Sequence, residues 1–153
     1  VPVYYSDVAL IAVQAKDVGL KAKLLGADGW DGVLEKIDKS NQDAVKDCYF
    51  CSQYSAESKD PKLQDFLKKY KEAYKSEANM FAVLGYDAMG MMAAAINKAG
   101  STDSDKIIAA LKALEYKGIT GNTTFDANRN PVREAVITTI ADGKYKFVEN
   151  FKK

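Results

Sequence analysis

Apolar side chains recur along this chain with two spacings, and the point where the spacing changes separates a helical part from a strand-rich part. Before Gly118 most apolar positions repeat at intervals of three and four, the spacing of an amphipathic helix. After Gly118 the period becomes two, which is typical of strands with one buried face. The two periods together predict a mixed α/β protein.

Capping and breaking residues give the limits of the expected elements. Ser6 is the expected N-cap of a first helix that Gly19 stops, and Asp60-Pro61 forms the clearest helix start in the sequence. Thr102 with Asp105 resembles a capping box, and Asp142-Gly143 predicts a hairpin turn. Helices are predicted over 7–18, 30 or 31 to 38, 61–74, 80–98 and 104–115, and strands over 23–26, 47–54, 120–125, 134–141 and 144–151.

The amino-acid composition excludes several classes of function. The 153 residues carry 22 basic and 21 acidic side chains, so the net charge of +1 is too small for a nucleic-acid-binding surface. The longest apolar run, Met89 to Ile96, is shorter than a membrane span, and a soluble protein is expected. The absence of histidine excludes a Ser/His triad and a His-based zinc site within this chain. Asp126-x-Asn128-x-Asn130 opens like a calcium loop but has Pro131 where glycine is required.

Aromatic and acidic residues come together at the ends of two successive predicted strands. Tyr4 and Tyr5 follow the first, and the loop with Asp28 and Trp30 follows the second. Ligands of open α/β sheets bind beyond the carboxyl ends of the strands. A carboxylate among aromatic walls suits a small cationic group such as an ammonium, which a free amino acid carries.

Five segments, in this order, resemble extracellular solute-binding proteins of the branched-chain amino-acid type. They are Val3-Tyr4-Tyr5-Ser6-Asp7, Ala15-Lys16-Asp17-Val18-Gly19, Leu25-Gly26-Ala27-Asp28-Gly29-Trp30-Asp31, Ala82-Val83-Leu84-Gly85-Tyr86-Asp87-Ala88-Met89 and Ile119-Thr120-Gly121-Asn122-Thr123-Thr124-Phe125-Asp126. The resemblance runs from the first residue to about Phe147. It implies an α/β protein with the type I periplasmic binding fold, in which two flavodoxin-like or Rossmann-like lobes are joined by hinge crossovers.

The resemblance also implies a domain division. Residues 1–54 and 134–153 are expected to form part of the second, C-terminal lobe, and residues 55–133 part of the first, N-terminal lobe. The chain is expected to cross the hinge near Tyr54 and Arg133. Only the C-terminal portion of the family's fold has a counterpart here, so the chain is expected to need the missing N-terminal half or a second copy of itself.

Four ligand-binding residues follow from the resemblance, and each has a plainer alternative. Tyr4 matches a tyrosine that packs over the ligand, although it can also end a strand for packing reasons. Asp28 matches the residue that holds the ligand's ammonium, although it can also cap a helix. Trp30 can wall the pocket or dock on the lobe, and Phe81 can contribute from the first lobe or pack in a helical stripe. The groups that grip the α-carboxylate lie in the part without a counterpart here.

The function that the resemblance implies is capture of an amino acid, most simply a branched-chain or hydrophobic one, by closure of the lobes. The protein is then the non-enzymatic, cofactor-free binding component of an ATP-driven importer. It delivers the ligand to a membrane permease and acts in the periplasm or as a cell-surface lipoprotein. A sensor domain of a receptor with the same lobes is the alternative. An α/β enzyme lacks support, because no G-x-G-x-x-G follows a predicted strand.

The two cysteines depart from the family pattern. Cys48 and Cys51 have the spacing of a redox pair, but the segment that carries them reads as a strand. Residues three apart on a strand point to opposite faces, so we expect two separate small side chains and neither a disulfide nor a shared metal.

Overall fold

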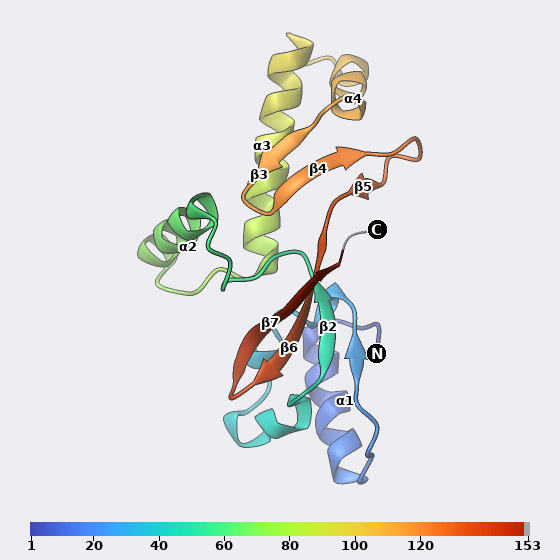
Figure 1. Ribbon diagram of the computed structural model, residues 1–153, viewed down its shortest axis with the longest axis vertical. Coiled ribbons are helices and arrows are strands. Elements are labelled where there is room, and N and C mark those ends of the chain that lie inside the picture. Colours follow the sequence, from blue (N-terminus) through green and yellow to red (C-terminus); the bar gives the residue numbers. More distant parts are fainter. Residues whose placement is uncertain (152–153) are drawn as a thin grey trace. The chain divides into compact units, whose positions relative to one another are not determined.

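The computed structural model describes residues 1–151 as two compact units (Figure 1). Unit 1 comprises Val1–Glu57 and Ala135–Phe151, and unit 2 comprises Ser58–Glu134. These boundaries lie within three residues of the crossings predicted near 54 and 133. Residues 152–153 of the predicted second-lobe range lie outside the described residues. That the units are parts of two lobes that move about a hinge stays a prediction.

Unit 1 is a mixed four-stranded sheet with one long helix. Its elements are α1 (Tyr5–Asp17), β1 (Leu25–Gly26), three short 3₁₀ segments (Asp28–Trp30, Val33–Glu35 and Lys39–Val45), β2 (Tyr49–Ser52), β6 (Ala135–Ala141) and β7 (Lys144–Phe151). The strand order is β1-β2-β6-β7, with β1 parallel to β2 and the other neighbours antiparallel. β7 is therefore an edge strand, and a register shift between Ile137 and Thr138 interrupts its pairing with β6.

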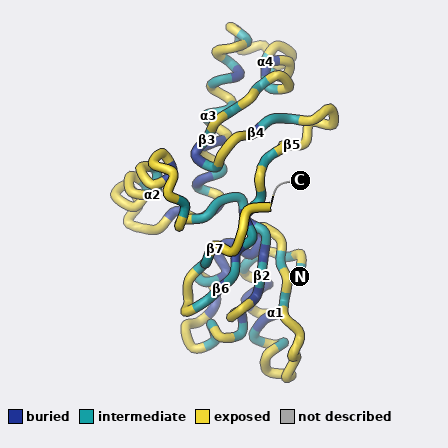
Figure 2. The backbone as a smooth tube through the Cα atoms, in the orientation of Figure 1, coloured by how far each residue is buried: buried dark blue, intermediate teal, exposed yellow. Residues whose placement is uncertain are grey.

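The core of unit 1 lies between α1, the 3₁₀ segments and one face of the sheet. Val8 and Ala12 from α1 meet Phe50 from β2 and Ile140 from β6, and Trp30 lies among them. In Figure 2, buried positions alternate with half-buried ones along β2, whereas on α1 the buried residues are limited to Val8, Ala9 and Ala12. The alternation of buried and less buried residues along β6 matches the predicted period of two.

Unit 2 combines helices with a small antiparallel sheet. Its elements are α2 (Pro61–Tyr74), α3 (Met80–Ala99), α4 (Ser104–Lys112), β3 (Tyr116–Gly118), β4 (Gly121–Phe125) and β5 (Pro131–Val132), with the strands in the order β3-β4-β5. α3 and α4 pack together, and each also contacts a strand of the sheet. α2 meets α3 through the rings of Phe66 and Tyr86, whose centroids are 4.8 Å apart.

Local signals with a clear mechanism are confirmed. The Asp60 carboxylate caps α2 by accepting from the Lys62 and Leu63 amides at 2.7 and 3.3 Å. Gly100 ends α3 with φ +60°, a left-handed conformation that suits glycine. Asp142 and Gly143 both have positive φ, as a two-residue hairpin of the predicted kind requires.

Four local predictions are wrong. α1 begins at Tyr5 without a side-chain cap, so Ser6 lies inside its first turn. The helix expected over 30–38 is replaced by two 3₁₀ turns, because Gly32 has φ +101° and no α-helix continues through that conformation. Asp103 caps α4 in place of Thr102, and α4 ends at Lys112, three residues before the predicted end at Glu115. β3 then begins at Tyr116 and pairs with β4.

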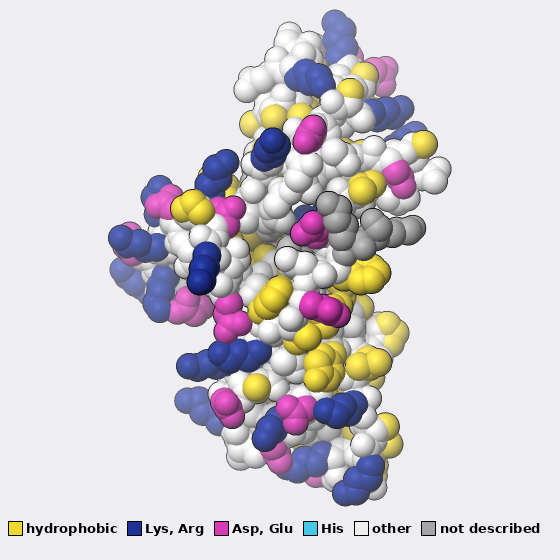
Figure 3. Space-filling model, in the orientation of Figure 1, with side chains coloured by type: hydrophobic (Ala, Val, Ile, Leu, Met, Phe, Trp, Pro, Cys, Tyr) yellow, Lys and Arg dark blue, Asp and Glu magenta, His cyan; other side chains and the backbone are white. Residues whose placement is uncertain are grey.

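The apolar stretch of α3 is longer than the run Met89 to Ile96 that the sequence indicated. By length and composition alone, α3 is the one helix among residues 1–151 that is long and apolar enough to cross a membrane. A core helix of a soluble protein passes the same test, so the property carries little weight by itself. Charged side chains of both signs are interspersed over the face shown in Figure 3.

Candidate functional site

The loop that carries Asp28 lies directly against Tyr4. A β-carbon built at Gly29 would come within 2.9 Å of the Val3 carbonyl oxygen and 3.3 Å of the Tyr4 ring. Only a residue without a side chain allows this approach of two segments. The structure thus brings together two of the predicted ligand-binding residues, Tyr4 and Asp28, from the start of α1 and the end of β1.

Both side chains are accessible. Tyr4 is 66% exposed, and Asp28 is exposed at the first position of its 3₁₀ segment. Burial, and after it the charge of Asp28, raises the pKa of the Cys51 thiol on β2. An exposed aromatic ring and an exposed carboxylate on neighbouring segments have the chemistry that an ammonium group requires.

Trp30 has a different position. Its ring is fully buried and stacks on Phe50 with 6.2 Å between centroids, and its Nε1 donates to the Val1 carbonyl oxygen at 2.9 Å. A β-carbon at Gly26 would lie 2.2 Å from Nε1, so the ring covers the backbone of β1. Trp30 therefore holds the Asp28 loop on the core, and a direct contact between Trp30 and a ligand stays a prediction.

Tyr145 supports the same loop from the far end of the chain. Its hydroxyl accepts hydrogen bonds from the Gly32 and Leu34 amides at 3.0 and 3.1 Å, and its ring meets Phe50 edge-on. Burial raises the pKa of Tyr145, so the phenol stays neutral. The sequence showed only an alternating strand here, and no local signal marks Tyr145 as a partner of residues more than 100 positions earlier.

Phe81 lies in unit 2, in the first turn of α3, and is 43% exposed. Its side chain is therefore not fully packed into the core of unit 2. Whether it contributes to one site with Tyr4 and Asp28 stays a prediction.

Asp87 is a second residue whose role the sequence did not reveal. It is 2% exposed, and its carboxylate accepts from the Ile119 and Thr120 amides at 2.9 Å each and from the Thr120 hydroxyl. A β-carbon at Gly118 would collide with this carboxylate. Asp87 therefore joins α3 to the turn between β3 and β4. It belongs to the family-like segment Ala82–Met89, and its role there is structural.

The two cysteines, Cys48 and Cys51, are free. Cys48 is buried in the core of unit 1, and burial raises its pKa. Cys51 is partly exposed. Across residues 1–151, no group of three or more His, Cys, Asp or Glu side chains is placed to hold a metal ion.

This chain is similar to known proteins in both sequence and structure. A curated leucine-, isoleucine-, valine-, threonine- and alanine-binding protein of Pseudomonas aeruginosa is 29% identical over 123 residues, which are 80% of this chain and 32% of that protein. A leucine-binding protein of Thermotoga maritima has a TM-score of 0.85 at 29% identity, over 99% of this chain and 43% of that one. A branched-chain amino-acid transporter substrate-binding protein of Streptococcus pneumoniae, solved with isoleucine, has a TM-score of 0.80 at 31% identity, over 96% and 43%.

This chain thus spans about a third of the curated relative and less than half of either solved structure. The family model described as periplasmic binding protein matches residues 3–144, nearly the whole range over which the five segments showed a resemblance. Fold and family are confirmed together: the chain belongs to the periplasmic binding protein family and has the C-terminal portion of its type I α/β fold, as found in the solved leucine-binding protein and the branched-chain amino-acid transporter substrate-binding protein.

Proposed function

We propose that this chain supplies part of the site with which a solute-binding protein captures an amino acid. The observation that carries the proposal is the approach of Gly29 to Tyr4, which sets the exposed Asp28 loop beside an exposed aromatic ring. Relatives named for binding leucine, isoleucine and valine support a branched-chain or other hydrophobic ligand. No bond is made or broken in this function, and no cofactor takes part in it.

In the proposed complex, Asp28 accepts the ligand's ammonium and Tyr4 covers the ligand. Trp30 fixes the loop from beneath, because its indole is bonded to the Val1 carbonyl oxygen. Phe81 approaches from the other lobe. Contacts from both lobes stabilise the closed state, so binding and closure are coupled.

The remainder of the site is proposed to come from the N-terminal half that the relatives possess, or from a second copy of this chain. The exposed apolar stripe of α3 supports this part of the proposal. Phe81, Met89 and Met92 are 43, 69 and 40% exposed at helical spacing on one side of the helix. An uncovered stripe of this kind needs an apolar partner surface.

The protein partner would be the membrane permease of an ATP-driven importer. We place the protein outside the cytoplasmic membrane, in the periplasm or as a cell-surface lipoprotein. Both statements follow from what the family does and not from a surface of this chain.

Calorimetric titration of leucine tests the proposal, first into the full-length protein and then into this chain alone. Asp28→Ala should weaken binding about ten- to a hundredfold, because a hydrogen bond to a charged group contributes about 1.5–3 kcal/mol. Asp17→Ala, which removes an exposed carboxylate at the end of α1, is the matched control. Equal affinity of the two variants would show that the pocket has been misplaced.

Two further titrations sharpen the result. 4-Methylpentanoate has the side chain and carboxylate of leucine without the ammonium, so it should bind weakly and should not respond to Asp28→Ala. This chain alone should bind leucine weakly or not at all, and should self-associate. A monomeric chain with micromolar affinity would contradict the need for a partner.

A further inference from the structure

We propose that the outer edge of β7 is a pairing site for β7 of a second copy of this protein, and that the Glu57 carboxylate keeps this site closed in the monomer. The proposal goes beyond amino-acid capture and concerns a different part of unit 1. β7 lies at the opposite end of the strand order from β1, whose end leads into the Asp28 loop.

β7 offers a long edge for pairing. It has eight residues, Lys144–Phe151, and its neighbour β6 lies on one side only. In an antiparallel pair, alternate residues direct their amide and carbonyl groups away from the neighbouring strand, so part of the β7 backbone faces outward. The apolar side chains Phe147, Val148 and Phe151 are 43, 41 and 59% exposed along the same strand. A long edge with exposed apolar side chains is a template for strand addition.

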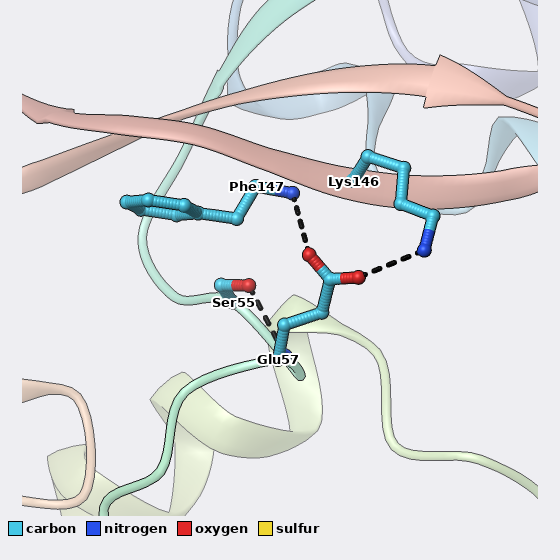
Figure 4. A network of polar contacts seen from close by, with 4 residues as sticks. All are labelled: Ser55, Glu57, Lys146 and Phe147. Atoms are coloured by element: carbon cyan, nitrogen blue, oxygen red, sulfur yellow. Dashed lines mark hydrogen bonds and ion pairs between the residues drawn. The ribbon is translucent and has the colours of Figure 1, made fainter.

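The Glu57 side chain binds this edge near its middle. One carboxylate oxygen accepts from the Phe147 amide at 3.0 Å, and the other accepts from Lys146 Nζ at 2.9 Å. Figure 4 shows the carboxylate turned toward β7 and bound to both donors. The Glu57 amide donates to the Ser55 hydroxyl at 3.2 Å, which holds the backbone that carries the side chain. The two bonds to β7 form the Glu57 anchor.

The Glu57 anchor and an incoming strand compete for the same amide. A strand that adds to β7 accepts hydrogen bonds from its outward amides, and the Phe147 amide is already bonded to Glu57. The register shift also interrupts the pairing of β7 with β6 at this point, where Thr138 pairs with Phe147 and Ile137 with Glu149. Proteins keep edge strands from pairing with charged side chains and bulges of this kind. Glu57 therefore blocks the edge, and its loss should open the site.

The order of charges along β7 favours a second copy as the partner. Lys144 and Lys146 lie in the first half of the strand, and Glu149 lies in the second half. When two copies of β7 pair antiparallel, the basic half of each lies beside the acidic half of the other, whereas a parallel pair would place like charges together. Phe147 and Val148 lie at the middle, where the two copies would meet about a two-fold axis. The edge is thus complementary to itself.

Sedimentation velocity of the full-length protein tests the proposal, because this chain alone is expected to self-associate through other surfaces. Glu57→Ala should form a dimer of twice the monomer mass, at a concentration at least about tenfold below that at which the wild type associates. This shift corresponds to the loss of one hydrogen bond to a charged group, which the wild type must break before it pairs. Glu57→Gln should have a smaller effect, because its carboxamide oxygen still accepts from the Phe147 amide.

A second substitution and an exchange measurement identify the surface. Val148→Lys puts a charge on the edge, so in combination with Glu57→Ala it should restore the monomer. In Glu57→Ala alone, hydrogen exchange of the Phe147 amide should slow as protein concentration rises and the dimer forms. Asp43→Ala is the matched control, because it removes an exposed carboxylate that binds Lys16 at 2.7 Å in the same unit, and it should sediment like the wild type.

Three results would overturn the proposal. They are association of Glu57→Ala no stronger than that of the wild type, a dimer that persists when Val148→Lys is added, and exchange of the Phe147 amide that does not depend on concentration in Glu57→Ala. Because no ligand enters these experiments, their outcome is independent of whether the protein binds amino acids.

Discussion

Gly29 lies against Tyr4 so closely that a β-carbon at position 29 would come within 3.3 Å of the tyrosine ring and 2.9 Å of the preceding carbonyl oxygen. This approach joins the start of α1 to the loop after β1, and it brings the two predicted ligand contacts of unit 1 together. The distance between Tyr4 and the Asp28 loop is therefore set by the absence of one methyl group.

Gly29→Ala should push the two segments apart. Overpacking of a buried position costs about 1–3 kcal/mol, and we expect that loss in urea unfolding followed by circular dichroism. Leucine affinity in the full-length protein should fall in parallel. Gly85→Ala is the control, because a β-carbon there meets no atom within 4 Å and α3 should gain about 0.5–1 kcal/mol. Similar unfolding curves for both variants would contradict the close approach.

Tyr145→Phe should destabilise unit 1 by removing one oxygen. The Gly32 and Leu34 amides would lose their shared acceptor, and leaving buried donors unsatisfied costs about 1–3 kcal/mol. The ring would still contact Phe50, so the lost stability can be attributed to the hydroxyl. Tyr74→Phe, at a 68% exposed position, should change the unfolding free energy by less than about 0.5 kcal/mol. A neutral Tyr145→Phe would mean that water replaces the hydroxyl.

Asp87→Ala should unfold or strongly destabilise unit 2. The Ile119 and Thr120 amides would lose a charged acceptor in a buried position, at a cost on the order of 3 kcal/mol or more. Thermal unfolding monitored through amide signals of β3 and β4 measures the effect. Asp65→Ala removes an exposed partner of Lys69 and should leave stability nearly unchanged.

The Glu57 anchor should weaken in acid. The Phe147 amide, and after it Lys146, hold the pKa of Glu57 below its ordinary value of 4.5. A lowered pKa in the folded state means that the contribution to stability is present above pH 4.5 and is lost as pH falls through the folded value. The Phe147 amide chemical shift should therefore titrate with a midpoint below 4.5. In Glu57→Gln this titration should disappear, and a midpoint at or above 4.5 would contradict the anchor.

Predictions from the sequence are confirmed where all the residues that form the feature lie within one short segment. The Asp60 cap bonds amides two and three residues away, and the Asp142-Gly143 turn needs only two residues with positive φ. The helix expected over 30–38 failed because the apolar spacing gave no sign that Gly32 would adopt φ +101°. Likewise, Ser6 and Thr102 were chosen as caps one or two residues away from the true helix starts.

By itself, the sequence determined the α/β class, most element positions and the family, because period, caps and ordered motifs are local properties of the chain. It also placed Tyr4 and Asp28 on successive segments. Only the tertiary structure decided that Trp30 is buried, that Tyr145 holds the Asp28 loop and that Glu57 is bound to β7. These contacts join residues up to 113 positions apart, and such pairs form through packing and backbone hydrogen bonding that no local pattern records.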